Sequence, residues 1–291
     1  MPKALKYPII FSMANLHEYP QSGNLVEREP ISKELEEKYQ AAKNAPLNPK
    51  DGFSKITPDE LYDLGKRILN AKDVWRAYDI LAETSASGLP YYDLVIGCQH
   101  LRPTYILFMA IEKLIPQPIE IGLDIGAGTG ISTLALVEGK CQKIITIDLN
   151  PKLLAWAKRK WTGITISLGD AIALCFPPNS FDIVIAQGLD PYLTLEEIQK
   201  FYQEVWRVLK PKGSFFKYLA DLPPNHPVYS TSPRAELAGV VAKALLSFTY
   251  APFYQVQRNF NPYEGLHFER KTLRVSGSPY NERILRLIKE G

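Results

Sequence analysis

The sequence predicts an α/β fold, a doubly wound sheet of seven strands that follows a helical N-terminal region. Two observations support this prediction. Helical signals dominate residues 1–115, whereas short apolar runs alternate with helical stretches across residues 116–291. Strands separated by helices form parallel β-α-β units. We therefore expect five parallel strands followed by a C-terminal antiparallel hairpin, with a domain boundary at 115/116.

The overall composition is that of an ordinary folded protein. The chain has 291 residues, of which 46% are hydrophobic and 22% charged, and its net charge of +3 is too small to indicate nucleic acid. No stretch approaches the ~18 apolar residues that span a membrane. The N-terminus lacks a signal-peptide pattern, so we expect a cytoplasmic protein without membrane insertion. The three cysteines have neither metal-type nor disulfide-type spacing, and no metal is expected.

The N-terminal region carries one clear helix start. Thr57-Pro58-Asp59-Glu60 supplies an N-cap, a proline at the first helical position and a glutamate three residues after the cap. Apolar residues at helical spacing follow it. We expect further helices near Ser32 and Tyr92, and an apolar core helix over residues 105–115.

Five apolar runs in the second region predict the parallel strands. They cover residues 119–125, 143–148, 165–168, 181–186 and 214–219. Asn150-Pro151 caps one intervening helix, and a capping box at Thr194 opens another that we expect to end at Gly213. The tail predicts a helix over 233–248, and then a hairpin formed by the alternating runs 254–260 and 266–275.

The strongest functional signal is L-D-I-G-A-G-T-G, residues 123–130. Gly126, Gly128 and Gly130 lie where the first strand turns into a helix, and glycine there permits positive φ and close approach of backbone N–H groups to a ligand. The helix N-terminus behind them favours an anionic group. Nicotinamide sites require G-x-G-x-x-G and P-loops end in G-K-[ST], and neither pattern is present.

Two carboxylates follow the next strands. Asp148 ends the second strand, where a carboxylate can accept both hydroxyls of an adenosine ribose. Asp170 follows the third strand, where it can accept a hydrogen bond from an adenine amino group, and Ala171 adds a backbone N–H. The sequence therefore predicts an adenosyl site at this edge of the sheet.

These motifs together resemble the class I S-adenosylmethionine-dependent methyltransferases, whose first motif, (D/E)-x-G-x-G-x-G, matches residues 124–130. P-P-N-S-F-D-I-V (177–184) and W-R-V-L-K-P-K-G (206–213) are similar to small-molecule enzymes of the quinone-biosynthesis type, although Lys212 replaces a common glycine. The resemblance implies a Rossmann-like fold and S-adenosyl-L-methionine as cofactor. It implies a cofactor site that comprises Asp124, Gly126, Ala127, Gly128, Gly130, Asp148, Leu149, Asp170, Ala171 and Gln187.

No particular catalytic residue is demanded, because methyl transfer from a sulfonium mainly requires alignment of the acceptor and exclusion of water. Gln187, Asp190 and Tyr192 follow the fourth strand, and His226 follows the fifth, so these four are candidates. The D-P-Y at 190–192 differs in position and length from the (D/N)-P-P-Y of amino-methylating enzymes.

Several functions stay open at this point. A small-molecule methyltransferase is favoured, with residues 1–115 as a lid or substrate-recognition element and Tyr91-Tyr92-Asp93 helping to exclude water. RNA or protein methylation is an alternative, for which Arg270, Lys271 and Arg274 are the only hint. Aminopropyl transferases share the fold, and a non-catalytic binding protein is the remaining alternative.

Overall fold

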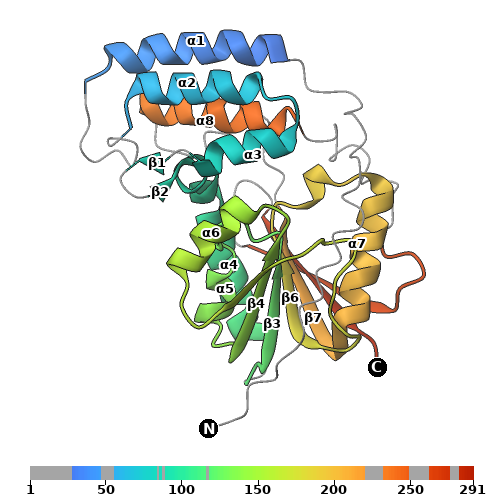
Figure 1. Cartoon of the computed structure of the whole chain (residues 1–291). Coiled ribbons are helices and arrows are strands. Elements are labelled where there is room, and N and C mark those ends of the chain that lie inside the picture. Colours follow the sequence, from blue (N-terminus) through green and yellow to red (C-terminus); the bar gives the residue numbers. More distant parts are fainter. Residues whose placement is uncertain are drawn as a thin grey trace.

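The computed structural model consists of a twisted sheet flanked by helices and a layer of helices over one end of that sheet (Figure 1). The described residues are 28–46, 56–83, 85–86, 89–115, 118–219, 232–248, 262–275 and 282–291. No helix among these ranges is long and apolar enough to cross a membrane.

The main sheet has seven strands in the order β5-β4-β3-β6-β7-β9-β8. Five run parallel to one another, and β9 runs antiparallel to both of its neighbours. The strands are β3 (Ile121–Ile125), β4 (Lys143–Asp148), β5 (Thr165–Leu168), β6 (Phe181–Ala186), β7 (Leu209–Leu219), β8 (Phe268–Arg274) and β9 (Arg283–Lys289). This arrangement confirms the predicted fold class.

Two details differ from the expectation. A C-terminal hairpin is present, and its strand β8 lies within the predicted run 266–275. Its second strand is β9, which was not predicted. The other predicted run, 254–260, lies outside the described residues. The helix that begins after Thr194 ends at Val208 rather than at Gly213, and β7 starts with the next residue. Gly213 is needed for a different reason, because a Cβ there would lie 2.8 Å from the Lys210 carbonyl oxygen.

Helices cover both faces of the sheet. On one face, α4 (Cys98–Leu114) and α5 (Leu134–Glu138) pack against apolar side chains such as Ile183 and Ile185 of β6. On the other face, α7 (Leu195–Val208) buries Phe201 against β7. The helix α6 (Pro151–Lys160) begins directly after β4, as the Asn150 cap predicts.

The helical layer has its own core. It contains α1 (Arg28–Asn44), α2 (Pro58–Leu69), α3 (Val74–Glu83) and α8 (Pro233–Leu246). Although α8 lies between β7 and β8 in the chain, it packs against both α1 and α2 (Figure 1). A short ladder of β1 (Ser85–Ala86) and β2 (Leu89–Pro90) and a π-helical turn, η1 (Tyr92–Gly97), connect this layer to α4. The boundary at 115/116 remains a proposal.

Candidate functional site

The glycine-rich bend after β3 has the backbone conformation that its sequence predicts. Gly126, Gly128 and Gly130 have φ values of +69°, +57° and +81°, the left-handed region that side chains with a Cβ disfavour. The N–H groups of Gly126 and Ala127 donate to the Ile147 carbonyl, at 2.9 and 3.1 Å. The bend is therefore held against the carboxyl end of β4.

A tyrosine from the helical layer lies against this bend. A Cβ on Gly128 would lie 2.8 Å from the hydroxyl of Tyr92, and one on Gly126 would lie 3.2 Å from the Leu189 side chain. The absence of side chains at these two positions leaves the room that Tyr92 and Leu189 occupy beside the loop.

Asp148 connects the bend to the start of α6. Its Oδ2 accepts a hydrogen bond from the Gly128 N–H at 2.8 Å, and its Oδ1 accepts one from the Asn150 N–H, also at 2.8 Å. Burial raises the pKa of Asp148, and these backbone donors oppose that shift. Each oxygen can accept further hydrogen bonds, as a ribose diol requires.

Asp124 lies beneath the bend and is fully buried. Its Oδ2 accepts hydrogen bonds from the hydroxyls of Ser132 at 2.8 Å and Thr133 at 2.7 Å. Its Oδ1 has no hydrogen-bond partner among the described residues. Burial raises the pKa of this carboxyl to about 7, although the two hydroxyls oppose the shift. A cationic group would satisfy the second oxygen and favour the ionised form.

A cavity of about 190 Å³ lies between the sheet and the helical layer. The predicted residues that line it are Gly126, Asp148, Leu149, Asp170, Ala171, Gln187 and Tyr192. The cavity thus brings together the ends of β3, β4, β5 and β6. Asp124, Ala127, Gly128 and Gly130 are not among the lining residues, since Asp124 lies in β3 beneath the bend and the other three belong to the bend itself.

Aromatic side chains form much of the opposite wall. Tyr78 of α3 lies 5.9 Å from Tyr92 and 5.5 Å from Tyr192, measured between ring centroids. Burial raises the pKa of Tyr192 to about 12 and raises the pKa values of Tyr78 and Tyr92 well above their ordinary value, so all three phenols are neutral near pH 7. Neutral hydroxyls in an apolar wall can orient a ligand by hydrogen bonding.

The remaining candidates lie in different surroundings. Gln187 is 8% exposed, and its Oε1 accepts a hydrogen bond from the Thr104 hydroxyl at 3.3 Å. Asp190 is not among the lining residues, because it is buried against the ammonium group of Lys217 on β7. Burial lowers the pKa of Lys217 to about 7, and the neighbouring carboxylate acts in the opposite direction. His226 lies outside the described residues.

Sequence reasoning missed α3, which supplies Trp75 and Tyr78 to the cavity wall. A local signal does exist, because the Asp73 carboxylate accepts the Arg76 N–H at 2.8 Å at the start of this helix. Buried residues at helical spacing, such as Ala77 and Leu81, follow it.

Comparison with known proteins gives a consistent family assignment for the central part of the chain. Residues 123–216 match the family model described as a methyltransferase domain. The chain is 30% identical to an uncharacterized methyltransferase-like protein of Schizosaccharomyces pombe over 38% of its length and 44% of that protein. It is 28% identical to a demethylmenaquinone methyltransferase of Chlorobaculum tepidum, over 62% of this chain and 72% of that enzyme.

Among solved structures, a possible exported protein from Bordetella parapertussis shares the fold. The TM-score is 0.53 at 15% identity, and the match covers 90% of this chain and 97% of that one. The chain spans under half of the length of the Schizosaccharomyces pombe relative that it matches.

Proposed function

Because this chain carries a class I S-adenosylmethionine-dependent methyltransferase domain, we propose that it transfers the methyl group of that cofactor to a small, uncharged, largely apolar acceptor. The observation that carries the proposal is the convergence of Gly126, Asp148 and Asp170 on one cavity. Each lies at the carboxyl end of a different parallel strand, where open α/β sheets bind their ligands.

The residues present fit the cofactor. Asp148 can accept the two ribose hydroxyls, and Asp170 and Ala171 offer an acceptor and an N–H donor for adenine. The unpartnered Oδ1 of Asp124 can accept a hydrogen bond from the ammonium of the methionine part. The cavity also suits the positive charge of a sulfonium, because aromatic faces and carboxylates both attract cations.

The charges of the cavity wall support an acceptor without phosphate or carboxylate. The described lining residues include Asp148, Asp170 and Glu197 but no lysine, arginine or histidine. A phosphate or carboxylate would meet like charges there and no cationic side chain among the described lining residues. Trp75, Tyr78 and other apolar lining residues instead favour contact with an apolar ring or chain. The relatives named as quinone-pathway methyltransferases agree with this class of acceptor.

The side chains then have limited tasks in the reaction. The cofactor supplies an activated methyl group, so the protein has to align the acceptor and exclude water. Tyr78, Tyr92 and Tyr192 keep neutral hydroxyls, which can hydrogen-bond to a polar group of the acceptor but do not act as bases near pH 7. Gln187, at the end of β6, can donate a hydrogen bond from its side-chain amide to the same group.

Transfer of label from methyl-labelled cofactor into cell extract tests the proposal. The extract is separated after the reaction into solvent-extractable neutral compounds, small anions, protein and RNA. We expect label in the neutral, extractable fraction. Label in small anions would contradict the acceptor class, and label in protein or RNA would favour the macromolecular alternative. No label in any fraction, together with no binding of S-adenosylhomocysteine, would refute methyl transfer.

A further inference from the structure

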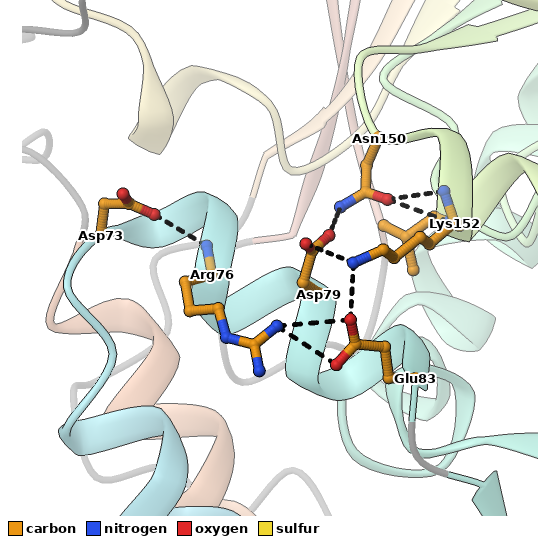
Figure 2. Close-up of polar contacts among 7 residues, drawn as sticks. Asp73, Arg76, Asp79, Glu83, Asn150 and Lys152 are labelled. Carbon is orange, nitrogen blue, oxygen red and sulfur yellow. Dashed lines mark hydrogen bonds and ion pairs between the residues drawn. The ribbon is translucent and has the colours of Figure 1, made fainter.

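A cluster of charged and amide side chains joins α3 to the start of α6 (Figure 2). The Asp79 carboxylate of α3 accepts a hydrogen bond from Asn150 Nδ2 at 3.1 Å and pairs with Lys152 Nζ at 2.6 Å. The same ammonium pairs with Glu83 at 2.6 Å. Arg76 Nη1 lies 3.2 Å from Glu83 Oε2, so Lys152 pairs with both carboxylates and Arg76 pairs with Glu83.

Asn150 uses its backbone N–H and both ends of its side-chain amide in this cluster. Its backbone N–H donates to Asp148 Oδ1, and its side-chain oxygen accepts the N–H groups of Lys152 and Leu153 at 2.9 and 3.1 Å. Its side-chain amide donates to Asp79. One residue, only 3% exposed, therefore connects the carboxylate beside the cavity, the first turn of α6 and the helical layer.

A neighbouring face of α3 forms part of the cavity. Trp75 and Tyr78 line it, and Tyr78 directly precedes Asp79 in the chain. A second contact with α6 holds the C-terminal end of α3, because Trp156 of α6 donates its indole N–H to the Ala82 carbonyl at 2.9 Å. The position of the aromatic wall relative to Asp148 is thus set by how α3 docks on α6.

We propose that Asp79 is a positioning residue that ties the ribose-binding end of the cavity to its acceptor wall. This inference rests on the proposed function, in which Asp148 holds the ribose. Cofactor binding then stabilises the Asp148–Asn150 turn and with it the docked position of α3. By linkage, a docked α3 favours cofactor binding to the same extent.

The cluster is partly exposed, which makes the coupling sensitive to salt. The side chains of Lys152, Asp79 and Glu83 are 42%, 28% and 37% exposed. Ion pairs with this exposure weaken as ionic strength rises. S-adenosylhomocysteine has no net charge near pH 7, so its own attraction to the protein contributes little salt dependence.

The test measures binding of S-adenosylhomocysteine by calorimetry and hydrogen exchange in α3 with and without that ligand. Asp79→Ala and Lys152→Met disrupt the cluster, whereas Asp79→Asn keeps an acceptor for Asn150 and loses the charge. Lys158→Met is the matched control, because Lys158 is an exposed lysine on the same helix, outside the ion pairs found among the described residues.

We expect ligand binding to slow exchange over residues 74–83 in the wild type and in the control. Asp79→Ala and Lys152→Met should lose this protection and bind about fivefold or more weakly, the low end of usual coupling between sites. Asp79→Asn should show an affinity and an exchange protection between those of the wild type and those of Asp79→Ala. Added salt should weaken binding in the wild type but have little effect in Lys152→Met. Equal affinity and equal protection in all variants would overturn the inference.

The outcomes also separate this inference from the proposed function. Failure of the wild type to bind S-adenosylhomocysteine would refute the proposed function itself. Binding by the wild type, with unchanged affinity and α3 protection in Lys152→Met and Asp79→Asn, would refute only the positioning role. Neither of these two substitutions creates a cavity in a core, so both variants should fold even if Asp79→Ala does not.

Discussion

Substitution of Gly128 by alanine tests the close packing of the helical layer on the glycine bend. Gly128 has φ +57°, and an added Cβ would lie 2.8 Å from the Tyr92 hydroxyl oxygen and 3.1 Å from its ring carbon Cζ. A left-handed backbone costs an alanine roughly 1–2 kcal/mol. Crowding against the partly buried ring of Tyr92 adds roughly 1–3 kcal/mol. Gly128→Ala should therefore destabilise the protein by about 2–5 kcal/mol.

Gly163 provides the matched control. It has φ +81°, yet an added Cβ would meet nothing within 4 Å. Gly163→Ala should show the backbone cost alone, about 1–2 kcal/mol. Tyr92→Phe removes the nearest atom and should restore part of the stability that Gly128→Ala loses.

Urea denaturation gives the free energy of unfolding for each variant, and calorimetry gives its affinity for S-adenosylhomocysteine. We expect Gly128→Ala to weaken that affinity, because the loop or Tyr92 has to shift, and Gly163→Ala to leave it unchanged. If the two alanine variants are equally stable and bind equally well, the argument from Tyr92 is wrong.

The remaining predictions concern the polar groups of Asp124, Lys217 and Tyr192. Burial raises the pKa of Asp124 to about 7, so below pH 7 this carboxyl becomes protonated and loses the charge that would attract the ammonium of the ligand. The affinity for S-adenosylhomocysteine should therefore fall by up to about tenfold per pH unit below 7. Calorimetry over this pH range should show no such fall in Asp124→Asn. The raised pKa also stabilises the free protein at low pH, and this contribution is lost as the pH rises from the ordinary pKa of 3.8 to about 7. In urea denaturation, the free energy of unfolding of Asp124→Asn should therefore depend less on pH over this range than that of the wild type. Lys217→Met leaves the buried Asp190 carboxylate without its cation and should cost about 3–5 kcal/mol in urea denaturation, whereas replacing both residues by apolar ones should recover most of this loss. Tyr192→Phe should lower the rate of methyl transfer to the identified acceptor while calorimetry shows unchanged cofactor affinity; weaker cofactor binding instead would place this hydroxyl on the cofactor side of the cavity.

Features stabilised by neighbours in the chain could be predicted from the sequence. The capping boxes at Thr57 and Thr194 are present, because each is completed within four residues. The glycine bend has the positive φ values that its spacing predicts. Apolar, largely buried runs account for four of the five parallel strands, whereas β5 is short and has no buried residue.

Features that depend on distant parts of the chain could not be predicted in this way. The helix α8 is a clear helix in the sequence, but its apolar residues surround it, and only the fold shows that they pack against α1 and α2. Asp190 follows the fourth strand like a site residue, yet its partner Lys217 lies 27 residues later on β7. The contact between Asp79 and Asn150 spans 71 residues and carries no local signal at all.

Titration of S-adenosylhomocysteine into the wild type and into Asp148→Ala tests the central claim most directly. We expect one molecule bound per chain, with binding weakened by about 1–3 kcal/mol in the variant through the lost charged hydrogen bonds to the ribose. Equal affinity for the two proteins, or no binding by the wild type, would contradict the placement of the adenosyl group beside Asp148.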